Sequence, residues 1–178
     1  MGCLARQRHL LTLPAARSAL VPGRAGYGGP MAADLELVRT LSLRENGLAT
    51  VSTVRADGTV HSSVVNAGVF EDPVTKAPGV AFVAMGGVKK LDLFRRAGHA
   101  TVTFRRGWEW AAVQGSTHLI GPDDPDPDFD ADGLPRLLRE VFIAATGTHD
   151  DWDEYDRVMA AERRVAVFVT ANRVSGNR

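Results

Sequence analysis

The chain is poor in cysteine, in lysine and in long apolar runs. Among its 178 residues Cys3 is the one cysteine, which excludes an intramolecular disulfide and suits a reducing cytosol. No run of about eighteen apolar residues occurs, so no membrane-spanning helix is predicted. The formal net charge is zero, and residues 31–178 carry 17 basic against 21 acidic side chains, so no basic field indicates nucleic-acid binding. We therefore expect a cytoplasmic protein with no membrane or nucleic-acid partner.

The first thirty residues differ in composition from the rest. They contain four arginines and no acidic residue, and Pro14 and Arg17 interrupt their apolar patch, which makes a poor signal-peptide core. We expect residues 1–30 to be a disordered extension, which translation from Met31 would omit. Residues 31–178 are enough for one well-buried domain and few for two.

The order of helix and strand patterns is readable from Asp34 onward. Apolar residues at helical spacing predict helices over 34–45, 134–145 and 151–162, and a shorter helix from the glycine pair at 86–87 to residue 97. β-Branched, alternating patterns predict strands over 48–55, 59–70, 79–85, 99–106, 108–120 and 163–170, with Val165, Val167 and Val169 on one face of the last. Residues 121–133 hold six aspartates and three prolines and predict a surface loop. Consecutive strands with short connections predict a mainly β, α+β fold, an antiparallel barrel with peripheral helices.

Two kinds of catalytic site lack support in the sequence. The histidines that follow residue 31 are scattered, and the cluster of His149 with Asp150 and Asp151 suits a helix start better than a metal ion, so we predict no metal site. The G-x-S-x-G motif of many hydrolases is absent.

Residues 85–96, MGGVKKLDLFRR, contain two of the three lysines in the chain. They fit neither the P-loop pattern nor a G-x-G-x-x-G turn. Glycines allow close approach of a ligand, the free N–H groups of a helix start attract anions, and Lys89 or Lys90 adds a positive charge. The alternative is a solvated lysine pair beside a glycine turn, and the spacing alone does not choose. In either case we expect neither lysine to contact the core.

Four stretches together resemble one known superfamily. They are GLATVSTVRADGTVHSSVVNAGVF, VAFVAMGGVKKLDLFRRAGHATVTF, WEWAAVQGSTHLIGPDD and HDDWDEYDRVMAAERRVAVFVT. The sequence resembles the split β-barrel flavin and deazaflavin oxidoreductases, the pyridoxamine 5′-phosphate oxidase-like superfamily, and most of all its coenzyme F420-dependent branch. The resemblance covers residues 34–174. It implies an antiparallel FMN-binding split β-barrel, and a homodimer with the cofactor in a groove between subunits.

The resemblance also implies a cofactor site. Lys89, followed by Lys90, falls at the phosphate, and the cofactor ring lies along the second hairpin strand beside Ser62, Val64 and Val65. Some flavin-binding relatives carry a phosphate-binding arginine where this chain has Ser63, and Ser/Thr and Arg where it has Gly87 and Val88. Because these charge-assisted contacts are missing, the resemblance favours exchangeable F420 over tightly held FMN.

Two further pairs have alternative interpretations. Trp108 and Trp110 are two residues apart and would share one side of a strand, either as a wall of the ring pocket or dimer seam or as ordinary packing aromatics. Arg163 and Arg164 either reach an acidic cofactor tail or, as we expect, pair with Glu162 and the aspartate-rich helix.

The function that follows is hydride transfer between reduced F420 and a small unsaturated organic substrate, with no side chain evident as proton donor. Two alternatives stay open. One is an FMN-dependent enzyme of the same fold, and the other is a non-catalytic dimer that binds a cofactor or metabolite.

Overall fold

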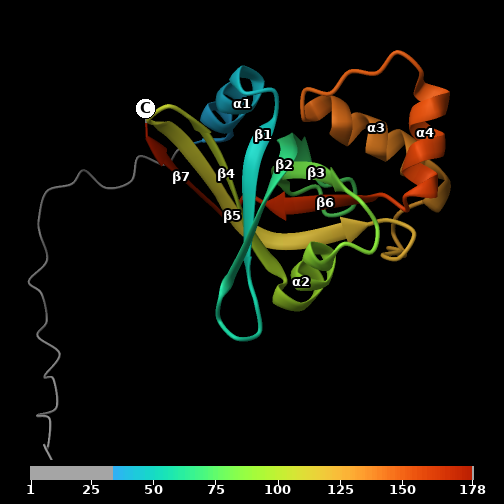
Figure 1. The fold of residues 1–178 in the computed structure, drawn as a ribbon, viewed down its shortest axis with the longest axis horizontal. Coiled ribbons are helices and arrows are strands. Elements are labelled where there is room, and N and C mark those ends of the chain that lie inside the picture. The colour runs from blue at the N-terminus through green and yellow to red at the C-terminus, as the bar shows by residue number, and fades with distance from the viewer. Residues whose placement is uncertain (1–33, 178) are drawn as a thin grey trace, which may run out of the picture.

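The computed structural model describes residues 34–177, so the extension expected over residues 1–30 lies outside the described part. The helices are α1 (Leu35–Arg44), α2 (Lys89–Ala97), α3 (Leu134–Ala144) and α4 (Trp152–Ala161), with a short 3₁₀ helix η1 (Ala131–Gly133). The strands are β1 (Leu48–Val54), β2 (Val60–Glu71), β3 (Pro78–Ala84), β4 (His99–Arg106), β5 (Glu109–Ile120), β6 (Val165–Thr170) and β7 (Arg173–Asn177). Every helix and strand expected from the sequence within this range is present, and β7 is additional (Figure 1).

Six of the strands close into an antiparallel barrel. The order β4-β1-β2-β3-β6-β5 is completed by pairing of β5 with β4, and every pairing is antiparallel. The strand β2 pairs with β1 through residues 60–66 and with β3 through residues 67–71, so the two partners diverge near Asn66. Strand β7 adds to β5 outside the ring. The mainly β architecture predicted from the sequence is confirmed.

The barrel interior forms the main core. Val51 of β1, Val102 of β4 and Val113 of β5 are buried there, and α2 closes one end of the barrel with Leu91 and Phe94. The three valines expected to share a face of β6 do so inside the barrel. A second apolar cluster lies outside it, where Phe168 of β6 packs beneath α3 and α4. Strand β6 is therefore buried on both faces, which explains its unbroken apolar sequence.

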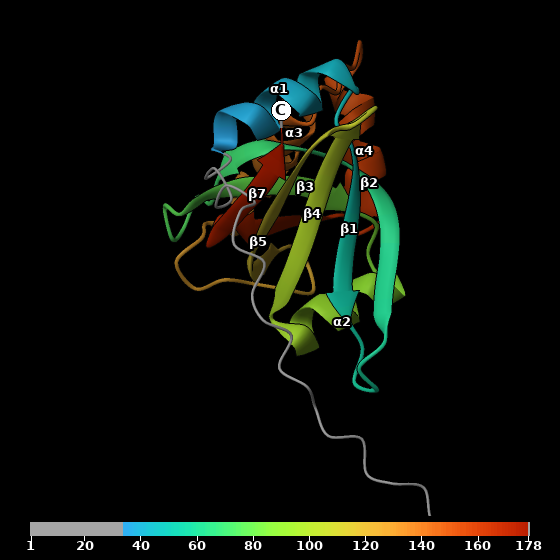
Figure 2. The ribbon, with the colours of Figure 1, turned by 90° about the vertical axis from the view of Figure 1, so that its left-hand side faces the viewer.

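One face of the sheet carries none of the helices within residues 34–177. Figure 2 shows β1, β2, β4, β5 and β7 facing the viewer, with α1 and α2 at opposite ends of the barrel. The register places the outward side chains in rows such as Val64–Thr50–Thr103–Ala112–Ser175 and Ser62–Ser52–Thr101–Gln114–Arg173. These rows contain no acidic residue, and Val64 is 63% exposed. We call these two rows the open face. Within residues 34–177, no helix is long and apolar enough to cross a membrane.

Candidate functional site

The start of α2 lies against the segment that joins α4 to β6. The amide N–H of Gly86 donates to the Glu162 carbonyl oxygen over 3.0 Å. A Cβ atom at Gly86 would lie 2.5 Å from the Arg163 carbonyl oxygen, so only glycine allows this approach. Gly87 adopts φ +70°, and α2 follows with Val88 as an N-cap that makes no side-chain hydrogen bond. The glycine pair thus brings the basic residues of two segments together.

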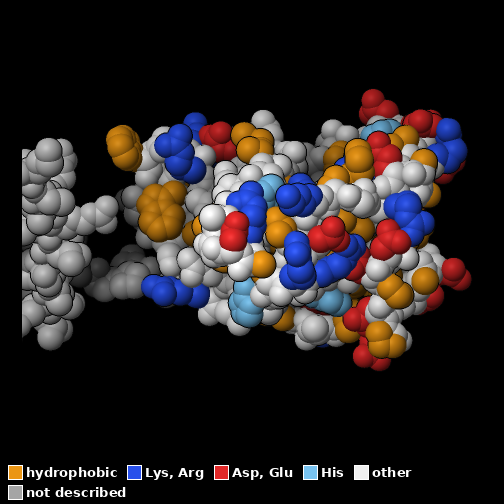
Figure 3. Space-filling model, turned by 60° about the horizontal axis from the view of Figure 1, so that its bottom comes forward, with side chains coloured by type: hydrophobic (Ala, Val, Ile, Leu, Met, Phe, Trp, Pro, Cys, Tyr) orange, Lys and Arg blue, Asp and Glu red, His pale blue; other side chains and the backbone are white. Residues whose placement is uncertain are grey.

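Three arginines near the start of α2 are paired with carboxylates, and Figure 3 shows basic and acidic side chains gathered at this end of the molecule. Arg164 pairs with Glu162, as expected from the sequence. Arg163 pairs with Asp123, which lies in the loop before α3, so the expected partner on the acidic helix is wrong. Arg95 bonds Asp124 over 2.6 and 2.8 Å. Among residues 34–177 no carboxylate lies within 4.0 Å of the ammonium of Lys89 or Lys90.

The two lysines differ in environment. Lys89 is exposed, whereas Lys90 is half-buried and its Nζ lies 5.9 Å from the centroid of the Phe82 ring. Burial, and then the nearby charge of Arg164, lower the pKa of Lys90 below its usual value. The expectation that neither lysine contacts the core is therefore wrong for Lys90, because Phe82 is fully buried.

The predicted ring-binding residues of β2 point in two directions. Strand alternation places Ser62 and Val64 on the open face, and Ser62 Oγ lies 2.8 Å from Ser52 Oγ. Ser63 and Val65 point into the barrel, and Val65 is buried in the core. The Oγ of Ser63 is buried and makes no hydrogen bond within the described chain. One protomer therefore offers Ser62 and Val64, and not Val65, to a ligand on the open face.

Trp110 lies far from Ser62 and Val64 of β2 within one protomer. It is on β5, three strands from β2 in the order β2-β1-β4-β5, which corresponds to roughly 14 Å. Its backbone N–H donates to Asn177 Oδ1 over 3.0 Å. Trp108 precedes β5, lies in the turn and is 92% exposed, so the expected shared strand face does not form. Trp110 can join the site only if a second copy brings it there.

The structure contains a pocket that was not predicted from the sequence. It lies beside Asn66, where β2 and β3 cease to pair. Its volume is about 210 Å³, and it is lined by Asn66, Val83, Phe142, Ala145, Tyr155, Met159 and Arg164. The Tyr155 hydroxyl donates to the Leu138 carbonyl oxygen over 3.2 Å, and burial raises the pKa of Tyr155 to about 12. Apolar stripes at helical spacing predicted α3 and α4, but no pattern in the sequence indicated where these helices would pack.

Comparison with solved structures places this arrangement among known folds. A protein from Bacteroides thetaiotaomicron named for 5-nitroimidazole antibiotic resistance aligns over 81% of this chain and 83% of its own, with a TM-score of 0.56 and 12% identity. An FMN-binding, pyridoxamine 5′-phosphate oxidase-related protein from Nostoc punctiforme aligns over 79% of each chain, with a TM-score of 0.50 and 15% identity. The fold is the pyridoxamine 5′-phosphate oxidase-like split β-barrel. A protein from Listeria innocua that is named as a pyridoxamine 5′-phosphate oxidase aligns over 80% of this chain and 98% of its own, with a TM-score of 0.50 and 13% identity. No protein-family model matches the sequence.

The residues of this split barrel fit an anionic ligand. Two ammonium groups that pair with no carboxylate in the described part of the chain lie at the start of α2, and that helix directs its free N–H groups toward the same place. The hydroxyl of Ser63 has no hydrogen-bond partner among the described residues, but it points into the barrel and is not offered to a ligand at the helix start. Such a donor set suits a phosphate, because every group present can donate a hydrogen bond or supply positive charge.

Proposed function

We propose that the chain is a homodimeric oxidoreductase that binds coenzyme F420 and transfers a hydride between the reduced deazaflavin and a small unsaturated organic substrate. The observation that carries the proposal is the pair of uncompensated lysines at the start of α2. A half-buried ammonium costs free energy unless an anion compensates it. Lys90 bears that cost beside a second cation, Arg164, which makes a bound anion the simplest reason for the arrangement.

The choice of F420 over FMN rests on what the helix start lacks. Val88 is the N-cap of α2 and offers no side-chain hydrogen bond, and Gly87 has no side chain. The phosphate contacts at this place are then limited to the two lysines and the backbone N–H groups of the helix start. We infer a site that holds its cofactor loosely enough for exchange, as a deazaflavin co-substrate requires.

The open face supports the dimer. Apart from Gln114 and Arg173 its outward side chains are small, hydroxylated or apolar, and it carries no acidic residue, so two copies can approach without placing carboxylates against each other. In this proposal the cofactor ring lies on Ser62 and Val64 of one protomer, and Trp110 comes from the other. The groove then requires both chains.

The protein contributes binding and orientation rather than acid–base chemistry. When bound, F420 supplies the hydride chemistry. Lys89 and Lys90 fix the anionic end, Val64 offers an apolar surface to the ring, and the partner subunit excludes water. Tyr155 is a poor proton donor, because its hydroxyl is engaged with Leu138 and burial raises its pKa to about 12.

The test is a titration of the purified full chain with F420 and with FMN, followed by cofactor fluorescence and calorimetry. We expect saturable binding of F420 and much weaker binding of FMN. A yellow protein that releases FMN on denaturation would instead favour the FMN-dependent enzyme. Binding of F420 without turnover in a screen of conjugated acceptors would favour a non-catalytic binding dimer.

A further inference from the structure

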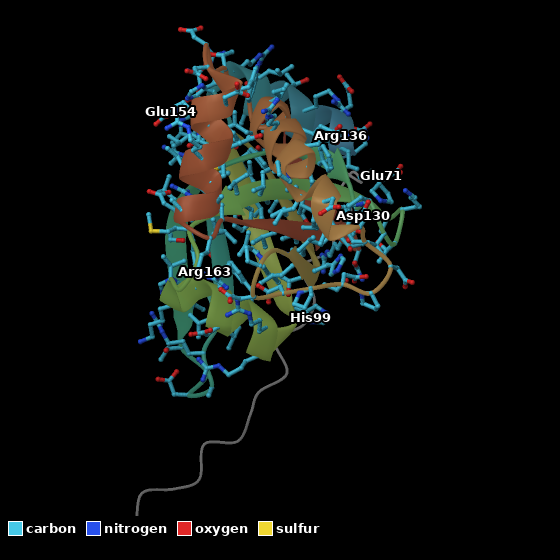
Figure 4. The ribbon with its side chains drawn as sticks, turned by 90° about the vertical axis from the view of Figure 1, so that its right-hand side faces the viewer. Glu71, His99, Asp130, Arg136, Glu154 and Arg163 are labelled. Carbon is cyan, nitrogen blue, oxygen red and sulfur yellow. The ribbon has the colours of Figure 1, made fainter. Side chains whose placement is uncertain are left out.

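The pocket between the barrel and the α3–α4 pair has an apolar body and a basic end. Its walls are Val83 of β3, Phe142 and Met159, and the rings of Phe142 and Tyr155 lie 5.0 Å apart at its side. Two residues of the lining have a charged or amide side chain, namely Arg164 and Asn66. Figure 4 views the molecule from this flank, with Arg163 at the end of α4 that faces α2. Arg164 lines the pocket and lies close enough to Lys90 for its charge to lower the pKa of that lysine, so it connects the pocket with the start of α2.

The volume limits what the pocket can hold. A cavity of roughly 150 Å³ is enough for benzene. At about 210 Å³ this pocket has room for a single ring with one or two small substituents, and not for a tricyclic ring system. Aromatic and aliphatic walls favour a flat, conjugated ligand.

The charges around the pocket favour an acidic ligand. Glu162 is held by Arg164, and Asp156 is held by Nε and one Nη of the Arg139 guanidinium, over 2.8 and 2.6 Å. Arg164 uses its Nε and one Nη for Glu162, which leaves its remaining N–H groups for a ligand. Lys90 adds positive charge nearby without a carboxylate partner among the described residues. The balance at this end is therefore positive.

We propose that this pocket binds a small conjugated ring carboxylate, with its ring between Val83, Phe142 and Met159 and its carboxylate at Arg164. The assignment of this ligand as the hydride acceptor rests on the proposed function. In that role one conjugated double bond gains a hydride from the reduced deazaflavin and a proton from water, and becomes a single bond. The binding site itself is independent of that role.

The binding test uses benzoate as the probe, with acetate and benzyl alcohol as matched compounds that lack the ring and the charge, respectively. Saturation-transfer NMR and calorimetry on the cofactor-free chain should rank benzoate above both. Arg164→Gln should weaken benzoate about tenfold or more, and Met159→Trp, which fills the pocket, should abolish binding of benzoate and benzyl alcohol alike. Arg136→Gln on α3 is the control, because this arginine is 84% exposed and pairs with Glu140.

The outcomes separate the two proposals. If F420 does not bind but benzoate binds with the expected dependence on Arg164, the pocket stands and the proposed function fails. If F420 binds but acetate equals benzoate, or Arg164→Gln changes nothing, the pocket proposal is overturned alone. Displacement of benzoate by saturating F420 would also overturn it, since the pocket would then be part of the cofactor site.

Discussion

Lys90 holds its ammonium 5.9 Å from the centre of the Phe82 ring, at the mouth of a barrel whose core includes that ring. Its neighbour Lys89 is exposed. Of these two adjacent lysines, one is thus partly desolvated and the other is exposed to solvent. Desolvation without a carboxylate partner is unfavourable for folding, and it strengthens attraction for an anion that arrives later.

Lys90→Met should lower affinity for F420 while leaving the protein equally or more stable at pH 7. Methionine keeps an unbranched chain and removes a charge-assisted contact, so affinity should fall about tenfold to a hundredfold. The pKa of Lys90 is lowered in the folded state, so its protonated form costs stability below that pKa, and the cost disappears as pH rises toward 10.5. Urea unfolding and fluorescence titration measure both effects.

Lys89→Ala should lower F420 affinity by a similar factor with no change in stability, because this side chain is exposed. Added salt should weaken the wild type more than this variant, since exposed charges are screened. The control is Lys76→Ala, which changes the remaining lysine, whose Nζ donates to the Pro73 carbonyl oxygen. Equal and small effects of all three substitutions on affinity would identify the lysines at the helix start as a solvated pair.

Val64→Asp should convert a dimer to a monomer without unfolding the protomer. The side chain is 63% exposed in the protomer, so an aspartate there is hydrated, but it would meet a second copy in a buried interface. Sedimentation at micromolar protein should change from about twice the chain mass of 19.1 kDa to about one chain mass. Val158→Asp on α4 is the control. A dimer that survives Val64→Asp and dissociates with Val158→Asp would place the interface elsewhere.

The sequence was informative about the fold because its elements are short and clearly separated. The turn at Asp57-Gly58 and the glycine pair at 86–87 separate strong local patterns, and the structure keeps those boundaries within two residues. Strand β7, RVSGN, was not predicted because its composition lacks a run of β-branched residues. It forms because β5 offers a free edge, which is a tertiary effect.

The candidate site was harder to predict, for reasons that are also physical. Strand alternation follows from any strand assignment, yet which side of β2 faces the core depends on the whole barrel, so Val65 could not be separated from Val64. The pocket needs Phe142 and Met159 from two helices to meet Val83 of β3. Which helices pack against β3 depends on long-range contacts, and no local pattern in a single sequence indicates those contacts.

Gly68→Ala should displace α3 and damage the pocket. A Cβ atom at Gly68 would lie 1.8 Å from the Ala144 carbonyl oxygen, so the last turn of α3 must move. Overpacking of this kind costs about 1 to 3 kcal/mol, and benzoate binding should weaken because Phe142 and Ala145 lie on that helix end. Gly133→Ala is the control, since its nearest contact would be Phe129 at 3.6 Å. Equal melting temperatures for the two variants would show that α3 adjusts without cost.

Asp72→Asn should destabilise the protein and flatten its acid unfolding curve. The carboxylate is 2% exposed and accepts hydrogen bonds from the backbone N–H groups of Val74 and Thr75. It also lies 2.6 Å from His118 Nδ1, and the other ring nitrogen of His118 lies 3.0 Å from Asp126, so the network joins two loops. Loss of one such charged partner costs roughly 1.5 to 3 kcal/mol.

The direction of the Asp72 pKa shift determines how the stability of the protein changes with pH. Burial would raise the pKa of Asp72, but the hydrogen bond from His118 and those from the backbone outweigh burial and hold the pKa below its usual 3.8. A lowered pKa contributes stability that is present above pH 3.8 and is lost as pH falls through the folded value. Urea unfolding between pH 7 and pH 2 should therefore show a steeper loss for the wild type than for Asp72→Asn. Glu71→Gln, which changes the exposed carboxylate next to Asp72 at the end of β2, is the control. Parallel curves for the wild type and the Asp72 variant would mean that the buried carboxylate contributes no pH-dependent stability.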